Sequence, residues 1–500
     1  MNVSKLLSKL AANKAGETAI LFNESQYTYG NLNAKANSLA AYLSEYGIKQ
    51  GDCISVILPN CPEFAFIYFA ASKLGAVFCP IDMRLGEKEL THILSSTRTR
   101  VCFTYPDFPH KDKLGESVSH MDIASPKFIS LIDNPREQLN ISLDISEDDT
   151  ALYLHTSGTT GIPKMVELSY ANMDCFPDAM KNCTIKGEKE ILGIILPMSH
   201  ISGPIILNLL LAAQCKLVII DSINPVSLFE NIANHHITYF HAVPPIFSLM
   251  LKSGLADRYD TSSLDIIAMM GTSVPVSLMN AFKRAFPHVV VLQGYGLTET
   301  SPLVTLTKRE DADLKRASIG TLVEGAEALI VDEKDTPLGV GEIGELIVRG
   351  PMVMKGYLDM PEQTGERIRN GYFYTNDLVK MDKDNYYYHM GRRDDMVVLA
   401  NGLNVYPAEI LNIVFSHPAV LDAAIIGIES AKHQGNILHA FVVPAPNAPL
   451  SETDIRDFCT DKLGNIKTPR KITLVESLPK TSTGKTDIKE LKNLATNSDG

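Results

Sequence analysis

Short apolar runs alternate with helical patterns over much of this chain, and this alternation limits the possible folds more than any other feature. Residues 53–59 (CISVILP) precede a helical pattern at 63–75 and a second apolar run at 76–82. Further runs with strand character, separated by helical patterns, occur at 191–197, 216–221, 237–243, 266–271 and 289–296. Repeated strand–helix–strand units imply parallel sheets whose faces are covered by helices. We therefore predict an α/β fold.

The pattern changes after about residue 320. Apolar runs at 327–332 and 344–350 are joined by turn residues without a long helix, which predicts an antiparallel or barrel-like subdomain. Beyond residue 395, helical patterns at 407–415 and 452–463 alternate with strand patterns. This texture is typical of a small separate α+β domain.

The polar stretch GRRDD at 391–395 lies where the pattern of predicted strands and helices changes for the last time. We place a domain junction there. The prediction is a large N-terminal part at residues 1–393 and a small C-terminal domain at residues 394–500.

Composition excludes several classes of protein. The 500 residues carry a net charge of −12, which argues against general nucleic-acid binding because that needs a basic face. None of the eight cysteines forms a CxxC pair, so we expect buried thiols in a reducing, cytoplasmic setting and no zinc cage. The N-terminus lacks the continuous apolar core of a secretory signal, and no uninterrupted apolar run of about 20 residues predicts a membrane span.

Residues 156–164 read TSGTTGIPK and follow the apolar piece at 151–154. Glycines allow the backbone to curl, and hydroxyls, amides and one ammonium can then surround phosphate oxygens. The spacing differs from that of a Walker A loop. The candidate phosphate-binding residues are Thr156, Ser157, Gly158, Thr159, Thr160 and Lys164.

This string resembles the signature of the adenylate-forming superfamily, which includes acyl-CoA synthetases, luciferases and peptide-synthetase adenylation domains. Five further segments resemble motifs of that family and occur in its order: 294–302 (GYGLTETSP), 341–357, 372–378 (YFYTNDL), 391–410 and 479–485 (PKTSTGK). The resemblance runs from about residue 25 to Lys485. It implies a large N-terminal domain of stacked, helix-covered sheets with a small barrel-like subdomain, followed by a small mobile C-terminal domain.

The resemblance also assigns the nucleotide-binding residues. It implies that Tyr295 stacks on adenine, that Thr298 bonds a phosphate oxygen and that Glu299 binds Mg²⁺, a cation that prefers carboxylate oxygens. Asp377 would bind the ribose hydroxyls and Arg392 the ribose or a phosphate. Gly271, Thr272 and Ser273 stand where the family has small residues beside the adenine and the acyl carbonyl, and Gly294 and Gly296 are further candidates for nucleotide binding.

Two residues depart from the family pattern. Met165 and Asn376 each stand where the family has glycine. If the backbone at 376 needs a positive φ, asparagine is the side chain that harms it least.

The resemblance makes Lys485 the catalytic lysine. An anionic carboxylate must approach an anionic α-phosphate, and an ammonium offsets their repulsion. Asp394 resembles the family's hinge residue, about which the C-terminal domain would turn between two orientations, one for each half-reaction.

The segment 196–204 (LPMSHISGP) resembles the part of the family that contacts the acid. It contains His200, which would line the pocket or gate it, and no acidic residue to pair with an α-ammonium. A fatty, aryl or other organic acid is therefore favoured over an α-amino acid. By the same resemblance the acyl pocket draws on His241, Ala242, Val243, Pro244, Gly271 and Thr272.

The predicted reaction joins a carboxylic acid to coenzyme A with ATP and Mg²⁺, through an acyl-adenylate. One alternative is transfer of the acyl or aminoacyl group to the phosphopantetheine thiol of a carrier protein. A second is a nucleotide-binding homologue without turnover, which only Met165 and Asn376 favour. A luciferase-type oxygenase is a third.

Overall fold

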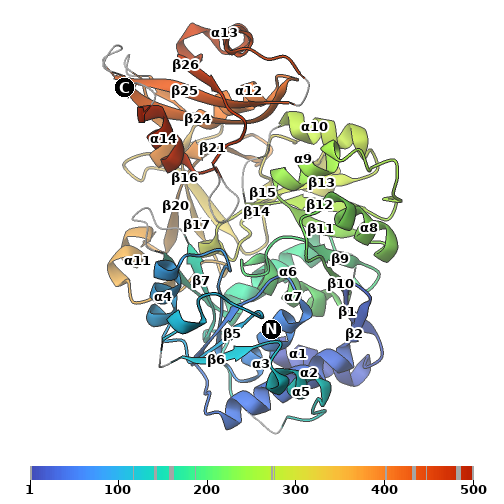
Figure 1. The fold of residues 1–500 in the computed structure, drawn as a ribbon. Helices are drawn as coiled ribbons and strands as arrows, with labels where there is room; N and C mark the ends of the chain where they lie inside the picture. The colour runs from blue at the N-terminus through green and yellow to red at the C-terminus, as the bar shows by residue number, and fades with distance from the viewer. Residues whose placement is uncertain are drawn as a thin grey trace.

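The structure is a computed structural model, shown in Figure 1. It describes residues 3–115, 118–139, 143–156, 163–185, 187–271, 274, 276–399, 403–430, 435–445, 448–479 and 486–497.

The first sheet has nine strands in the order β15-β14-β13-β12-β11-β9-β10-β1-β2. Neighbours from β13 to β1 pair in parallel, and the strands at both edges are antiparallel. The strands are β1 (Thr18–Phe22), β2 (Ser25–Thr28), β9 (Ile191–Ile194), β10 (Lys216–Ile219), β11 (Tyr239–Ala242), β12 (Ile266–Met269), β13 (Val290–Tyr295), β14 (Thr305–Leu306) and β15 (Thr321–Leu322).

The second sheet has seven strands in the order β18-β8-β7-β4-β3-β5-β6. Its pairs from β7 to β6 are parallel, so the predicted parallel pairing is confirmed in both sheets. The strands are β3 (Cys53–Ile57), β4 (Val77–Pro80), β5 (Val101–Thr104), β6 (Ser119–Asp122), β7 (Thr150–Thr156), β8 (Lys164–Ser169) and β18 (Gly356–Tyr357).

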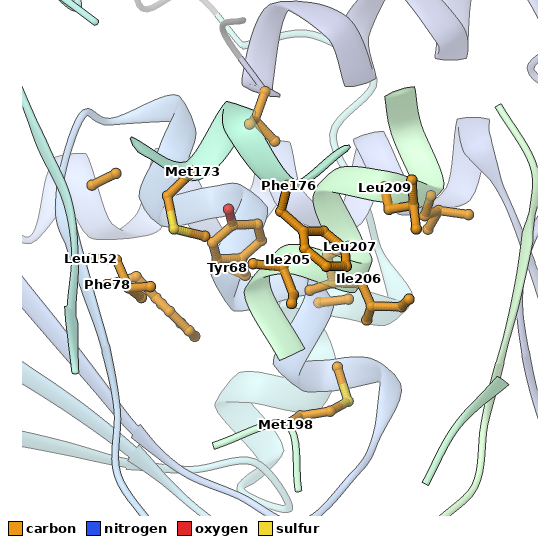
Figure 2. Close-up of a cluster of buried hydrophobic side chains, with 14 of the residues drawn as sticks. Tyr68, Phe78, Leu152, Met173, Phe176, Met198, Ile205, Ile206, Leu207 and Leu209 are labelled. Atoms are coloured by element: carbon orange, nitrogen blue, oxygen red, sulfur yellow. The ribbon is translucent and has the colours of Figure 1, made fainter. Parts of the chain in front are cut away.

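Helices cover the two sheets because their apolar faces must be buried. Helices α6 and α7 pack against each other, and Figure 2 shows Phe176 of α6 pointing toward Ile206 and Leu207 of α7. The helices of this part are α1 (Val3–Asn13), α2 (Tyr29–Glu45), α3 (Pro62–Lys73), α4 (Glu87–Ser96), α5 (Pro126–Asp133), α6 (Tyr170–Cys183), α7 (Ser202–Ala213), α8 (Pro225–His235), α9 (Pro244–Lys252) and α10 (Val276–Ala285), with short 3₁₀ turns at η1 (Lys111–Lys113), η2 (Thr298–Thr300) and η3 (Arg309–Asp311).

A third sheet is antiparallel throughout, which confirms the change of pattern predicted after residue 320. Its order is β16-β17-β20-β19, and β21 pairs with β20. The elements are β16 (Glu327–Val331), β17 (Gly344–Arg349), α11 (Pro361–Arg367), β19 (Ile368–Arg369), β20 (Tyr372–Met381) and β21 (Tyr387–Arg392).

The C-terminal domain lies at one end of the molecule in Figure 1 and has its own apolar clusters. A turn, η4 (Arg393–Asp395), leads into it from β21, and helix α12 contacts both β21 and α10. Its elements are β22 (Val397–Val398), β23 (Asn404–Val405), α12 (Pro407–Phe415), β24 (Val420–Ser430), β25 (Gly435–Pro444), α13 (Glu452–Lys467), β26 (Lys471–Leu474) and α14 (Ile488–Asn497). The boundary between residues 393 and 394 stays a prediction.

No helix in the described part of the chain is both long enough and apolar enough to cross a membrane.

Candidate active site

Four of the predicted site residues, and Asp82, which was not predicted, lie where parallel strands end. In the first sheet, β9 leads to the turn that holds His200, β12 leads to Gly271 and β13 leads to Gly296. In the second sheet, β7 ends at Thr156 and β4 ends just before Asp82. Ligands of α/β proteins bind outside the carboxyl ends of parallel strands, so this edge is where chemistry is expected.

Asn60 joins the carboxyl edges of the two sheets. It follows β3, and its side-chain amide donates to the carbonyl oxygens of Leu196 (3.1 Å) and Ile220 (3.0 Å). Its Oδ1 accepts from the backbone N–H of Met198 at 2.8 Å. The segment before His200 is thereby fixed against the second sheet.

His200 lies at this junction, as the sequence predicts for a residue near the acid. Its Nε2 is 3.5 Å from Asp82 Oδ2, and its ring centroid is 6.3 Å from that of His155. Arg84 forms a forked ion pair with Asp82, at 2.9 Å from Nε and 2.6 Å from Nη2. Burial raises the pKa of Asp82, but the Arg84 contacts and the His200 charge outweigh burial and lower it. Burial and His200 lower the pKa of His155 to about 4, so His155 is neutral near pH 7.

Asp377 is the centre of a second cluster, formed by the third sheet and the end of β13. Its side chain is 5% exposed and accepts a hydrogen bond from Tyr295 Oη at 2.7 Å. His389 Nε2 and Arg392 Nε lie 3.3 and 3.2 Å from the other carboxylate oxygen. Asp377 and Arg392 are direct cross-strand partners of β20 and β21. Burial works to raise the pKa of Asp377, and the contacts with His389 and Arg392 lower it on balance.

This cluster contains three of the predicted nucleotide residues, Tyr295, Asp377 and Arg392, and explains why Tyr295 is held in place. Burial, followed by the charge of Asp377, raises the pKa of Tyr295, which keeps its hydroxyl a donor. Arg392 also donates from Nη2 to the Thr375 carbonyl oxygen at 3.1 Å. A carboxylate, a tyrosine ring and a guanidinium are thus fixed within one network.

Glu299 belongs to a third group, which links η2 to the start of β8. Tyr357 Oη donates to Glu299 Oε1 at 3.0 Å, and the Lys164 ammonium lies 5.0 Å from the Tyr357 ring centroid. The Glu299 carbonyl oxygen also accepts from the Met354 N–H at 2.9 Å. The donor set fits a magnesium nucleotide, because a partly exposed carboxylate is the kind of ligand that Mg²⁺ takes together with phosphates and water. A search of the described residues finds no group of three or more histidine, cysteine and acidic side chains that could hold a metal by itself.

Close packing explains two glycines of the site, and backbone conformation explains the third. A β-carbon on Gly296 would overlap the carbonyl oxygen of Pro302, and one on Gly294 would lie 3.0 Å from side-chain atoms of Leu303 and Met270. Gly271 has a φ of 89°, a conformation that favours glycine. Gly294 and Gly296 are therefore limited by space, whereas Gly271 is limited by its backbone conformation.

The two departures from the family pattern also have structural explanations. Asn376 has a φ of 64°, so its position does need a positive φ, as the sequence analysis anticipates for a residue that replaces glycine. Its side chain donates to Asp394 Oδ2 at 2.6 Å. Met165 is buried in an apolar cluster with Leu358, so its side chain serves the core beside the loop.

Thr156 and Lys164 lie opposite each other at the ends of β7 and β8, and Thr298 begins η2. Several predicted site residues lie outside the described residues: Ser157, Gly158, Thr159, Thr160, Thr272, Ser273 and Lys485. For them, as for the roles of the other site residues, the assignments stay predictions.

Sequence reasoning missed His389, Tyr357, Asp82 and His155. His389 lies on β21 and pairs with Val379, directly after the YTNDL motif, so it is a usable signal only once the strand pairing is known. Asp82 ends an apolar run, and a charge directly after a buried strand could have been read as a site residue.

Comparison with known proteins agrees with this geometry. Residues 7–358 match the family model described as AMP-binding enzyme, and residues 409–485 match the AMP-binding enzyme C-terminal domain. A 4-coumarate–CoA ligase of Solanum tuberosum is 29% identical over 488 residues, covering 94% of this chain and 89% of the relative. A feruloyl-CoA synthase of Amycolatopsis is 27% identical over 470 residues, covering 94% of both chains.

A solved structure gives the same result. The o-succinylbenzoate–CoA synthetase of Bacillus subtilis, in complex with its acyl-adenylate intermediate, superimposes with a TM-score of 0.87 at 26% identity, covering 97% of each chain. The matched models cover most of the sequence, in the predicted order. The chain belongs to the AMP-binding enzyme family, as its resemblance to the adenylate-forming superfamily predicts.

Proposed function

We propose that this protein uses ATP to activate an aromatic carboxylic acid and then transfers the acyl group to coenzyme A. The sequence analysis predicts the ligase reaction, and the family match and the named CoA ligases support it. The choice of an aromatic acid goes further. It is supported by relatives whose names specify 4-coumarate, ferulate and o-succinylbenzoate, each of which contains an aromatic ring.

The observation that carries the proposal is the meeting of two parallel sheets at their carboxyl edges, beside a network that suits a nucleotide. The Asp377 carboxylate can accept from a ribose diol, and Tyr295 offers a flat face beside it. Lys164 stands at the end of the loop whose hydroxyls and amides we assign to the phosphates.

In the first half-reaction a carboxylate oxygen of the acid attacks the α-phosphorus of ATP, and pyrophosphate leaves. In the second the thiol of coenzyme A gives up its proton and attacks the acyl carbon, and AMP leaves. We assign Glu299 to magnesium, which when bound would neutralise phosphate charge. We assign Lys485 to the repulsion between the acid and the α-phosphate.

The acid side supports an organic acid rather than an α-amino acid. Asp82 is the carboxylate beside His200, but Arg84 already holds it in a forked ion pair. An ammonium group would have to compete with that guanidinium. Binding of an amino acid through this carboxylate is therefore disfavoured.

The acceptor is proposed to be coenzyme A rather than a carrier protein, on the strength of the named CoA ligases. Both acceptors present the same thiol. Rates measured with coenzyme A and with a phosphopantetheinylated carrier, at matched thiol concentration, separate the two.

The test is a pyrophosphate-release assay with aromatic, fatty and amino acids, run with and without coenzyme A. We expect release with aromatic acids and formation of the corresponding thioester when coenzyme A is present. If none of the acids in the panel stimulated pyrophosphate release, the ligase assignment would be overturned. Equal rates with fatty and aromatic acids would overturn the choice of an aromatic acid.

A second arm tests the metal assignment. Glu299→Gln keeps the shape of the side chain and a carbonyl oxygen for Tyr357, but removes the charge. We expect the magnesium concentration for half-maximal activity to rise about 10-fold. An unchanged magnesium dependence would remove Glu299 from the metal site.

A further inference from the structure

Two buried polar atoms on one face of β11 stand out. Tyr239 is 1% exposed and His241 is 6% exposed, and the two residues share a strand face because they are two positions apart. Neither Tyr239 Oη nor His241 Nε2 has a hydrogen-bond partner within the part of the chain that the structure describes. Their ring centroids are 5.1 Å apart in an edge-to-face arrangement, so the two rings are neighbours.

Apolar groups border this pair. The Phe176 ring of α6 packs edge-on against His241 at 5.4 Å between centroids, and Figure 2 places Phe176 among apolar side chains of α7. Burial lowers the pKa of His241 to about 4, so the imidazole is neutral near pH 7 and has one N–H donor and one acceptor nitrogen.

The opposite face of the same strand shows what ordinary packing requires. Phe240 and Ala242, whose side chains carry no polar atom, pack there into an apolar cluster. A buried polar group without a partner is costly to keep, and buried polar atoms in proteins are nearly always hydrogen-bonded. Two such groups side by side therefore call for an explanation outside the core.

β11 runs toward the candidate active site: His241 is one residue before its carboxyl end, and Tyr239 begins the strand. His241 pairs with Ala268 of β12, and the Ala242 carbonyl oxygen accepts from the Met270 N–H at 3.3 Å. The next residue is Gly271, where a β-carbon would meet open space. A group bound in front of these strand ends could extend toward Tyr239 and His241.

From this geometry we infer that Tyr239 and His241 recognise a hydroxyl or amino substituent on the aromatic ring of the acid, at the end remote from its carboxylate. The inference rests on the proposed function and names its substrate class more closely. The substituent donates to or accepts from the imidazole and bonds the tyrosine hydroxyl. Side chains such as Phe176 fill this space in the structure, so they must move when the ring of the acid binds.

The test compares matched acids that differ by one hydroxyl: cinnamate with 4-hydroxycinnamate, and benzoate with its 2-, 3- and 4-hydroxy forms. Acid-dependent pyrophosphate release gives kcat/KM for each. We expect the wild-type protein to prefer at least one hydroxylated acid by about 10- to 100-fold over its unsubstituted partner. Tyr239→Phe and His241→Leu should each reduce that ratio about 10-fold or more.

Tyr170→Phe is the matched control. Tyr170 is also buried, and its hydroxyl likewise has no hydrogen-bond partner among the described residues. It begins α6 beside the amino end of β7, because its N–H donates to the Asp149 carbonyl oxygen at 3.2 Å. Loss of this hydroxyl should leave the ratio unchanged.

A stability measurement keeps the inference testable without turnover. If Tyr239 Oη has no partner in the protein, Tyr239→Phe should keep or raise the Tm of the ligand-free chain. A fall of several degrees would show a structural role and overturn the inference. Equal ratios in wild type and both β11 variants, or a wild-type preference for unsubstituted acids, would also overturn it, and the proposed function would still stand. If no acid drives pyrophosphate release, both proposals fail.

Discussion

The two sides of the candidate site are built in opposite ways. On the nucleotide side, which we define as Tyr295, Asp377, His389 and Arg392, each of these residues takes part in one network of hydrogen bonds and charges. On the acid side, defined as Phe176, Tyr239 and His241, apolar packing surrounds two polar atoms for which the described residues supply no partner.

The difference matches what each side would bind. A nucleotide is the same in every turnover, so a preorganised, charged network loses little on binding. An acid must be told apart from similar acids, and a buried polar atom that only the correct substrate satisfies gives strong discrimination. Completed contacts therefore indicate affinity for a common ligand, whereas missing contacts indicate selectivity.

The largest expected effect comes from Lys485→Ala, which removes the charge that the C-terminal domain is predicted to bring between the two sides. We expect adenylation to fall about 10³-fold or more, because an offsetting charge is lost where two anions meet. Thiolysis of supplied acyl-adenylate should stay close to wild type. Single-turnover assays of each half-reaction measure this, and an equal loss in both would contradict the assigned role.

As the pH is lowered, the free energy of unfolding should fall first through His241 on the acid side. The pKa of His241 is lowered to about 4 by burial, against an ordinary value near 6.5. The unfolded chain then binds a proton that the folded chain does not, so the stabilisation is complete above pH 6.5 and is lost as pH falls toward 4. We expect wild type to lose about 3 kcal/mol more than His241→Leu between pH 7 and pH 4.

Urea denaturation over this range measures the difference. Asp377 also contributes to the free energy of unfolding, and its pKa is lowered in the folded chain. That contribution is lost only as the pH falls through the lowered pKa of the carboxylate. Parallel stability curves for wild type and His241→Leu would show that the imidazole is not kept neutral by burial.

Asp377→Asn should weaken the nucleotide side specifically. It keeps the size of the side chain but removes the charge that faces Arg392 and His389. We expect the KM for ATP to rise about 30-fold, equivalent to about 2 kcal/mol, with a smaller change in the KM for the acid. Tyr295→Phe, which removes one hydrogen bond, serves as the graded control. If the KM for the acid rose as much as the KM for ATP, Asp377 would not act on the nucleotide side alone.

Local patterns in the sequence predicted the layers of the fold. Runs such as 53–59 and 237–243 did form buried parallel strands, and the turn-rich stretch after residue 320 did form an antiparallel sheet. The division into two sheets could not be predicted from the same patterns. β1, near the start of the chain, pairs with β10 about two hundred residues later, and such pairing depends on tertiary packing.

The candidate site divides in the same way. Motifs predict roles for Asp377, Tyr295 and Glu299, because the chemistry calls for those side chains in those strings, and the roles stay predictions. Their partners were not identified, since His389 and Tyr357 reach them through the register of strands that are distant in sequence. On β11 the resemblance named His241 for the acyl pocket but not Tyr239, because an unpartnered atom is a property of packing and not of any motif.

The smallest expected effect concerns Asn376, beside Asp377 on the nucleotide side. Its φ of 64° would suit glycine, yet its side chain donates to Asp394 Oδ2 at 2.6 Å and its N–H donates to Glu345 Oε1 at 2.9 Å. Asn376→Gly keeps the backbone free to adopt this φ and removes only the side-chain contact. Asn376→Ala removes the same contact and also strains the backbone.

We expect Asn376→Gly to lower the free energy of unfolding by about 0.5 kcal/mol and Asn376→Ala by about 1.5 kcal/mol. Urea denaturation of both, with Asp394→Ala as the control for the contact alone, separates backbone from side chain. If Asn376→Ala lowered the free energy of unfolding no more than Asn376→Gly, the positive φ would carry no cost. Asparagine would then stand at 376 only for its hydrogen bond to Asp394, in the turn that begins the C-terminal domain. If instead Asp394→Ala matched Asn376→Gly, the hydrogen bond would account for the glycine effect, and the further loss in alanine would measure the strain at this single position.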